Sequence, residues 1–278
     1  MDVKKILNEN DFKFKKNFGQ NFLTDKTLLE NIVIGAGVDK KDTVLEIGVG
    51  AGTLTYELSK KANKVIGYEI DKTLSSVLDK TLADCFNVEI VFADALKTPI
   101  EKIEKKLGGK YRLVSNLPYY ITTPLIMKFI QEAENCVSIT AMVQKEVALR
   151  LCAGEGSSEY GAITAGIDVV GDSKIIAFVD RTMFTPMPKV DSAVVNISIN
   201  KNKYSVLSMK KYRDVVRCAF SSRRKTFVNN LMNSFSLPRE NAENVLKSFG
   251  IDVKARGETL STEQFVKLAN YLEEKGLP

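Results

Sequence analysis

The feature that most constrains the fold of this chain is a regular alternation of strand-like and helix-like segments over residues 24–199. Short runs rich in Val and Ile are followed by segments with apolar residues three and four positions apart. The strand-like runs are residues 43–47, 64–68, 88–92, 111–115, 137–143, 173–179 and 192–199. Such alternation indicates a parallel sheet with helices on both faces. We therefore predict a doubly wound, Rossmann-like α/β domain over residues 1–202.

The rest of the chain has a different pattern. Helical spacing of apolar residues is found in residues 209–220, 225–235, 238–249 and 261–272, and no strand-like run follows residue 199. The polar stretch at residues 200–203 separates the two patterns. We predict a small, all-helical C-terminal domain over residues 203–278.

The absence of histidine limits the chemistry. It excludes a His general base, a Ser-His-Asp triad and most His-ligated catalytic metals. The four cysteines are scattered without CxxC spacing, so we expect reduced thiols and no metal site. No leader and no apolar run of about 18 residues is present, so we expect a cytoplasmic protein that does not enter a membrane.

Candidate ligand-binding features follow four strand-like runs in turn. They are the glycine turn at Gly48, Gly50 and Gly52, and the side chains of Glu69, Asp94 and Asn116. In open α/β sheets, ligands bind beyond the carboxyl ends of the strands. Each feature alone also fits a tight turn, a solvated strand-end acid or a cap. Together they predict a site for an adenosine-containing cofactor.

The roles in that site follow from the side chains. The glycines allow close approach of the backbone to a ligand. Glu69 lies where a carboxylate accepts both ribose hydroxyls, and Asp94 suits the adenine amino group. The alternate spacing of the glycines, with Glu46 two residues before the first, departs from the GxGxxG pattern. A dinucleotide oxidoreductase is therefore disfavoured, as it is by the missing histidine.

The segment Asn116–Tyr119 predicts a second, base-recognising function. Pro118 stiffens the loop, so that the Asn116 amide oxygen, the Leu117 carbonyl and the Tyr119 ring are presented together. Two acceptors and a stacking platform suit the amino group of a flat heterocycle such as adenine. The plain alternative is a tight strand–helix turn with Tyr119 as a packing residue. We expect Thr123 to be the N-cap of the following helix.

These features, with further motifs in the same order, resemble the rRNA adenine N6,N6-dimethyltransferases. The additional motifs are Gly19–Leu23, Val143–Val147, Tyr160–Gly161 and Phe184–Ala193, and the tail motifs are Ala219–Thr226 and Asn229–Leu231. The tail and the length of 278 residues resemble the KsgA type of this family.

The resemblance implies S-adenosylmethionine as cofactor and assigns two groups of residues. Those that contact the cofactor or border its methyl group are Asn21, Leu23, Gly48, Gly50, Glu69, Asp94 and Asn116. Tyr119 and Phe184 would sandwich the target adenine, beside the acceptors on Asn116 and Leu117. The chain departs from the family pattern at Val49, where proline is commoner, and at Tyr120, where Asn is usual.

The implied reaction is dimethylation of two adjacent adenosines in a hairpin loop near the 3′ end of small-subunit (16S) rRNA during ribosome biogenesis. The implied partner is the precursor of the small ribosomal subunit, and we expect a monomer. Two alternatives stay open. One is a large-subunit (23S) rRNA dimethyltransferase of the macrolide-resistance type, and the other is a non-catalytic nucleic-acid-binding factor on the same fold.

A basic segment gives a candidate RNA-binding surface. Residues 201–225 contain nine Lys or Arg against one acid, Asp214, in a chain of net charge +6. We expect Arg217, Arg223, Arg224 and Lys225 to bind rRNA phosphates, the last three from the start of a helix. The stretch Lys13–Lys16 would extend this surface. The plain alternative is a solvated helix face.

Overall fold

The computed structural model describes residues 21–277. Gly19, Gln20 and the basic stretch Lys13–Lys16 lie outside the described residues. The chain divides into two compact units, and both are discontinuous in sequence. Of the described residues, 21–148 and 173–199 form the first unit, and 149–172 and 200–277 form the second. The second unit thus includes residues 149–172 as well as the C-terminal helices, and the predicted domain division after residue 202 stays a prediction.

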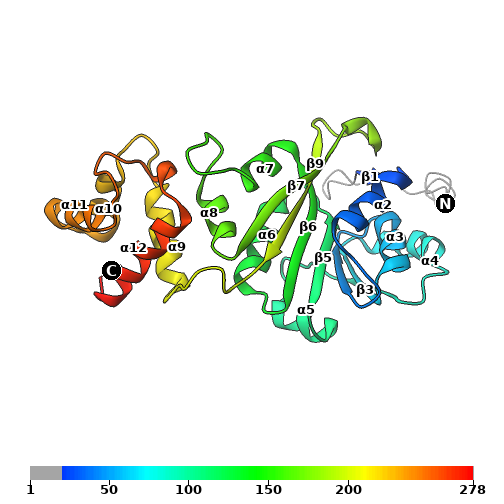
Figure 1. The fold of residues 1–278 in the computed structure, drawn as a ribbon. Coiled ribbons are helices and arrows are strands. Elements are labelled where there is room, and N and C mark those ends of the chain that lie inside the picture. Colours follow the sequence, from blue (N-terminus) through cyan, green and yellow to red (C-terminus); the bar gives the residue numbers. More distant parts are fainter. Residues whose placement is uncertain (1–20, 278) are drawn as a thin grey trace. The chain divides into compact units, whose positions relative to one another are not determined.

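The first unit is built on a seven-stranded sheet with the order β4-β3-β2-β5-β6-β9-β7 (Figure 1). Its strands are β2 (Thr43–Ile47), β3 (Lys64–Glu69), β4 (Val88–Phe92), β5 (Tyr111–Asn116), β6 (Cys136–Gln144), β7 (Gly171–Val179) and β9 (Ser192–Ile199). Strands β2 to β6 pair in parallel. From β2 the chain runs outward through β3 and β4, then returns to the other side of β2 with β5. The point of reversal therefore lies between β2 and β5, where open α/β sheets bind ligands.

The Rossmann-like α/β fold is confirmed, but the sheet is mixed. Strand β9 pairs antiparallel with β6, with Ala141 opposite Val195. No crossover helix separates β7 from β9, because residues 180–191 contain only the short turn η3 (Arg181–Met183) and the two-residue strand β8 (Phe184–Thr185). A parallel return would require a longer crossover connection. Strand β8 forms a small separate sheet with β1 (Phe22–Leu23).

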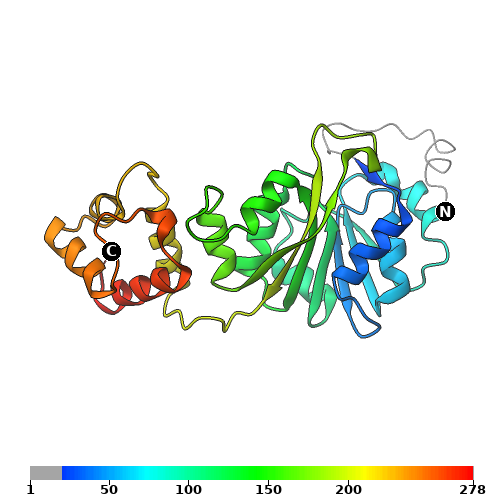
Figure 2. The same cartoon turned by 45° about the horizontal axis from the view of Figure 1, so that its top comes forward.

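Helices cover both faces of the sheet (Figures 1 and 2). They are α2 (Lys26–Gly35), α3 (Thr53–Lys61), α4 (Ser75–Thr81), which continues the short turn η2 (Lys72–Leu74), α5 (Ile100–Leu107) and α6 (Thr122–Glu132). α2 and α3 share one apolar core with Val44, Val65 and Val114 of the central strands. Tyr111 lies three residues before Val114 and therefore faces the opposite side of β5. There its ring makes an edge contact with Phe129 of α6.

The second unit contains the end of α7 (Lys145–Leu151), α8 (Ala162–Asp168) and the four helices predicted for the C-terminal region. These four are α9 (Met209–Ala219), α10 (Phe227–Phe235), α11 (Arg239–Ser248) and α12 (Thr262–Glu274), with the short turn η4 (Gly257–Thr259) before the last. The Tyr212 hydroxyl donates to the Ala165 carbonyl across 2.8 Å, which joins α9 to α8. Phe265 of α12 packs edge-on against Phe227 of α10.

Two predicted helix starts differ from the structure. Helix α6 begins at Thr122 after Ile121, so Thr123 is not its N-cap. The Thr122 hydroxyl instead donates to the Pro118 carbonyl and closes the preceding loop. Arg223–Lys225 lie in the turn before α10 rather than in its first turn, because the N-cap is Thr226. Among the described residues, no helix is long and apolar enough to cross a membrane.

Candidate active site

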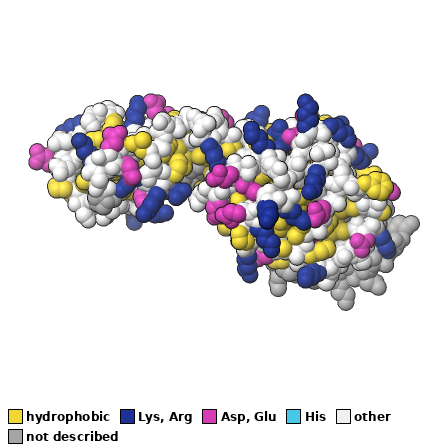
Figure 3. All heavy atoms as spheres, turned by 90° about the horizontal axis from the view of Figure 1, so that it is seen from below, with side chains coloured by type: hydrophobic (Ala, Val, Ile, Leu, Met, Phe, Trp, Pro, Cys, Tyr) yellow, Lys and Arg dark blue, Asp and Glu magenta, His cyan; other side chains and the backbone are white. Residues whose placement is uncertain are grey.

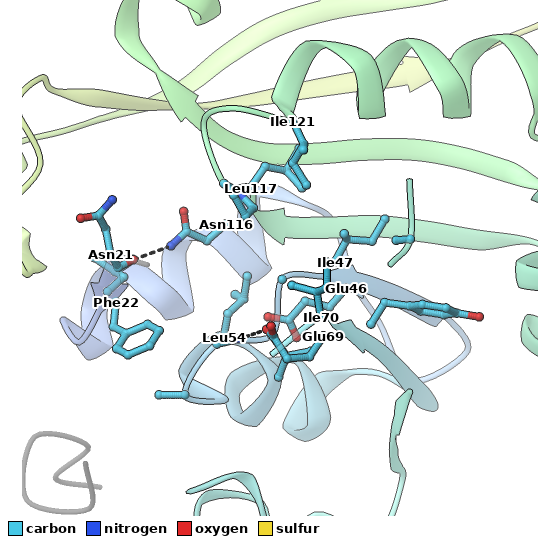
Figure 4. A pocket seen from close by; sticks show the side chains of 18 of the residues that line it. Asn21, Phe22, Glu46, Ile47, Leu54, Glu69, Ile70, Asn116, Leu117 and Ile121 are labelled. Carbon is cyan, nitrogen blue, oxygen red and sulfur yellow. Dashed lines mark hydrogen bonds between the residues drawn. The ribbon is translucent and has the colours of Figure 1, made fainter. Parts of the chain in front are cut away.

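A pocket lies at the carboxyl ends of β2, β3, β4 and β5 in the first unit (Figure 4). Nine of the ten residues predicted for the cofactor and the target base line it. They are Asn21, Leu23, Gly48, Gly50, Glu69, Asp94, Asn116, Leu117 and Tyr119. Their meeting follows from the parallel pairing of the strands, which brings the strand ends to one edge of the sheet. The functional roles of these residues stay predictions.

The glycine turn between β2 and α3 forms one wall. Gly48, Gly50 and Gly52 all have positive φ, at 79°, 60° and 82°, which side-chain-bearing residues rarely adopt. Space is also limited, because a Cβ atom on Gly48 would lie 3.2 Å from the Pro118 ring. The turn thus places bare backbone against the loop of residues 117–121, which joins β5 to α6.

Glu69 at the end of β3 is held by backbone donors. Its two carboxylate oxygens accept from the N–H groups of Gly50, at 2.9 Å, and Asp71, at 2.8 Å. Burial raises the pKa of this carboxyl, and the two backbone donors act in the opposite direction. Each oxygen keeps capacity for a further hydrogen bond. The carboxylate is therefore oriented before any ligand arrives.

A second carboxyl group, Glu46 of β2, lies beside Glu69 in the pocket wall (Figure 4). Only 1% of Glu46 is exposed, and its Oε2 atom has no hydrogen-bond partner in the described part of the chain. Burial raises its pKa to about 8, and the charge of Glu69 acts in the same direction. The sequence by itself indicated no role for Glu46 in the site. The feature that could have indicated a role is an acidic residue inside the otherwise mostly apolar run of residues 43–47.

Asp94 lies in a tight turn after β4. Its Oδ1 atom accepts from the N–H of Leu96 at 3.0 Å, and its Oδ2 atom lies 3.7 Å from the Lys97 ammonium. One carboxylate oxygen therefore stabilises the turn. The other belongs to a side chain that lines the pocket.

The last residue of β5 and the loop of residues 117–121 that leads to α6 present two acceptors. The Asn116 side-chain nitrogen donates to the Asn21 carbonyl at 3.3 Å, which directs its Oδ1 atom away from that contact (Figure 4). Within residues 21–277, neither Asn116 Oδ1 nor the Leu117 carbonyl accepts a hydrogen bond. The Pro118 carbonyl, in contrast, accepts from Ile121 and Thr122 and closes the turn.

The loop is also joined to the sheet on two sides. The Ser115 hydroxyl accepts from the Ile47 N–H at 2.8 Å, beyond the last β2–β5 ladder pair. The Tyr119 hydroxyl lies 2.7 Å from Ser192 Oγ at the start of β9. Ser192 is fully buried, so the far end of the Tyr119 ring is attached to the rigid sheet. Ser192 belongs to a motif recognised in the sequence, but nothing there indicated this contact.

Phe184 is not brought to the pocket as a partner of Tyr119. Its backbone pairs with Leu23 in the β1–β8 ladder, and its side chain is 4% exposed in the core shared with α2. The short β8 strand turns the ring inward, which the sequence did not reveal. Tyr120, in contrast, lines the pocket and is 55% exposed. Phe184 is thus not among the residues that line this pocket, and its predicted stacking opposite Tyr119 stays a prediction.

Comparison with known proteins decides the family. The model for "Ribosomal RNA adenine dimethylase" matches residues 11–274. The chain belongs to this family. A curated member from Clostridioides difficile, "Ribosomal RNA small subunit methyltransferase A", is 42% identical over 98% of this chain and 96% of its own length.

Two solved structures of this kind share the fold. A dimethyladenosine transferase from Plasmodium falciparum has a TM-score of 0.81 and 28% identity, covering 92% of this chain and 98% of that one. The 23S rRNA methyltransferase ErmE has a TM-score of 0.72 and 27% identity, covering 91% of this chain and 100% of that one. The predicted family and the Rossmann-like methyltransferase fold are confirmed.

The basic segment of this dimethylase separates into paired and unpaired cations, all in the second unit. Lys203 lies within 2.8 Å of Asp168 and Asp172, and Arg217 lies 3.0 Å from Asp214. Arg223 donates to the carbonyls of Ser158 and Tyr160, at 2.8 and 2.9 Å, and so holds a loop of its own unit.

Arg224 and Lys225 are exposed in the turn before α10 and make no ion pair with a described residue. Over the face drawn in Figure 3, Lys and Arg side chains are interspersed with Asp and Glu rather than gathered in one block. The two unpaired cations of the turn are therefore better placed to meet a phosphate than the segment as a whole.

Proposed function

We propose that this dimethylase transfers methyl groups from S-adenosylmethionine to N6 of two adjacent adenosines near the 3′ end of small-subunit rRNA. The observation that carries the proposal is the pair of uncommitted acceptors, Asn116 Oδ1 and the Leu117 carbonyl, on a loop that lines the same pocket as Glu69 and Asp94. An amino group on a flat base and an adenosine-containing cofactor would then meet in one cavity. The choice of the small subunit is supported by the 42% identical relative of that name.

The pocket residues fit S-adenosylmethionine. Side chains at Gly48 and Gly50 would crowd the glycine turn, because a Cβ atom would lie 3.2 Å from Pro118 in the first case and 3.0 Å from Phe22 in the second. Glu69 offers oriented acceptors for the ribose hydroxyls, and Asp94 offers one for the adenine amino group. Asn21 and Leu23 close the side next to Asn116. When bound, S-adenosylmethionine supplies an electrophilic methyl group.

Asn116 and Leu117 act on the nucleophile. Two hydrogen bonds from the adenine amino group to these acceptors would hold N6 in line with the methyl group and favour a pyramidal nitrogen. Orientation of this kind contributes several kcal/mol to rate acceleration. Tyr119 supplies a stacking face, worth about 1–3 kcal/mol for a base taken out of its stack. The proton released from N6 can pass to water, so a chain without histidine suffices.

The second unit supplies rRNA contacts in this proposal. Arg224 and Lys225 would bind phosphates. Arg217 would also bind a phosphate if it gives up its ion pair with Asp214. Arg223 would shape the surface by holding residues 158–160. We propose action as a monomer on the small-subunit precursor in the cytoplasm.

The proposal is tested by supplying labelled S-adenosylmethionine with unmethylated small subunits or with unmethylated large subunits. We expect label in small-subunit rRNA alone, at two adjacent adenosines when the modified bases are mapped by mass spectrometry. Label in large-subunit rRNA would support the macrolide-resistance alternative instead. Binding of rRNA without any methylation would support the non-catalytic alternative.

A further inference from the structure

Lys128 on α6 makes an unusual set of contacts for a lysine. Its ammonium nitrogen lies 2.6 Å from the Thr98 carbonyl oxygen, 2.7 Å from that of Leu96 and 3.2 Å from that of Ala95. An ammonium group has three donors, so one turn of backbone takes all of them. In the described part of the chain, every acceptor of Lys128 is a backbone carbonyl. The charged ammonium group of Lys128 therefore serves to hold one turn of backbone.

The turn needs such a partner because of its sequence. Its N–H groups point toward Asp94, whose Oδ1 accepts from Leu96 and whose carbonyl accepts from the Thr98 N–H at 2.9 Å. A continuing helix would satisfy the Ala95 carbonyl with the N–H of residue 99. That residue is Pro99, which has no N–H. Pro99 therefore leaves the Ala95 carbonyl without a helical donor, and Lys128 supplies one to this carbonyl as well as to those of Leu96 and Thr98.

The position of the turn connects Lys128 with the pocket. Asp94, Ala95 and Leu96 all line the pocket. Helix α6 begins at Thr122, immediately after the loop of residues 117–121 that follows Asn116. A helix is stiff over two turns, so Lys128 fixes the Asp94 turn relative to the end of that loop. The contacts of Lys128 thereby fix the position of the Asp94 turn relative to the loop that follows Asn116.

We infer that Lys128 is a positioning residue for the adenine end of the cofactor. It holds residues 95–98 so that the Asp94 carboxylate faces the pocket, and it touches neither substrate. This inference rests on the proposed use of S-adenosylmethionine. If Lys128 had a purely structural role, it would stabilise the first unit without any specific effect on ligand affinity.

The test uses the full chain and three variants. Lys128→Met keeps the aliphatic stem and removes the donors, and Lys128→Gln keeps a short uncharged donor. Lys102→Met, on the exposed face of α5, is the matched control. Affinities for S-adenosylmethionine and for adenosine are measured by calorimetry, steady-state kinetics are measured on unmethylated small subunits, and amide hydrogen exchange is followed at residues 95–98.

For Lys128→Met we expect the Kd of both ligands to rise by about tenfold, because binding must then order the Asp94 turn that Lys128 no longer holds. The KM for S-adenosylmethionine should rise with it, kcat at saturation should stay within about twofold, and amides 96–98 should exchange faster. Lys128→Gln should show the same pattern more weakly, so the inference remains testable if the Met variant does not fold.

Unchanged affinity for adenosine in a folded Lys128 variant would overturn the inference, and so would a fall in kcat with KM unaffected. An effect as large in Lys102→Met would also overturn it. Failure of the proposed function is distinguishable, because the unsubstituted chain would then bind no S-adenosylmethionine or methylate no rRNA.

Discussion

The side-chain nitrogen of Asn116 donates to the backbone carbonyl of Asn21 across 3.3 Å, between residues 95 positions apart in sequence. This bond decides which way the amide faces, because the nitrogen is committed to Asn21 and the oxygen is left for a ligand. Asn21, directly before β1, therefore orients the acceptor that the proposed reaction requires.

Replacing Asn116 by Ala should impair methyl transfer far more than cofactor binding. The acceptor matters most as positive charge develops on N6, so the rate of a single turnover should fall by about 10- to 150-fold, the value of a hydrogen bond to a charged group. Asn116→Asp keeps an acceptor but loses the donor to Asn21, and we expect an intermediate rate. Single-turnover kinetics and calorimetry with S-adenosylmethionine measure the two effects. Near-normal turnover in Asn116→Ala would remove the loop from the mechanism.

Glu69→Ala should act through the cofactor. Loss of the oriented carboxylate should weaken S-adenosylmethionine binding by about 1.5–3 kcal/mol, because charge-assisted hydrogen bonds to the ribose are lost. Glu69→Gln keeps the shape and one acceptor, so its loss should be smaller. Calorimetry checks both variants. A Glu69→Ala chain that binds as tightly as the unsubstituted chain would contradict the strand-end assignment.

The contact between Tyr119 and Ser192 should matter for the target base alone. Tyr119→Phe keeps the stacking face and removes the hydroxyl, and Ser192→Ala removes its partner. Each should lower the methylation rate by a few-fold, about the 0.5–1.5 kcal/mol of one neutral hydrogen bond, with unchanged affinity for S-adenosylmethionine. The double variant should be no worse than either single one, since both remove the same bond. Additive losses would show that the two side chains act independently.

Glu46 should make stability depend on pH in an identifiable direction. Its pKa in the folded chain, about 8, lies above the value of about 4.3 expected after unfolding. The folded state thus binds the proton more tightly, so the stabilisation is complete below pH 4.3 and is lost as the pH rises through 8. Glu46→Gln removes this loss. Its melting temperature relative to the unsubstituted chain should rise by several degrees between pH 5 and 8.5.

The control for Glu46 is Glu101→Gln on the exposed surface of α5. Its melting temperature should follow that of the unsubstituted chain at every pH. If the difference in melting temperature between Glu46→Gln and the unsubstituted chain is the same at every pH, Glu46 stays ionised in the folded chain.

Two groups of cations should behave differently toward rRNA. Neutralising Arg224 and Lys225 together should weaken small-subunit binding and reduce its salt dependence by roughly 0.7–0.9 log units per lost phosphate contact. Arg223→Ala should instead loosen residues 158–160, because it removes the hydrogen bonds to Ser158 and Tyr160. Binding measured over a salt series separates the two effects. An unchanged slope after the double substitution would exclude this turn from the rRNA contact.

Local patterns determined much of this protein. Runs rich in Val and Ile defined the strand-like segments 43–47 and 88–92 with the bounds that the structure has, because β-branched residues favour strands. The strand-end residues Glu69, Asp94 and Asn116 could be grouped in advance, since parallel strands bring their carboxyl ends to one edge. The family could be recognised from short motifs, each of which lies within a few consecutive residues.

Contacts between distant segments were decided only by the tertiary structure. The antiparallel pairing of β9, the inward turn of Phe184 and the grouping of residues 149–172 with the C-terminal helices depend on packing that no local period encodes. The same holds for Ser192 beside Tyr119 and for Lys128 beside the Asp94 turn, where an ordinary residue gains its role from a partner 30 or more positions away. Sequence determines which side chains are available at each strand end, and three-dimensional packing decides which of them meet.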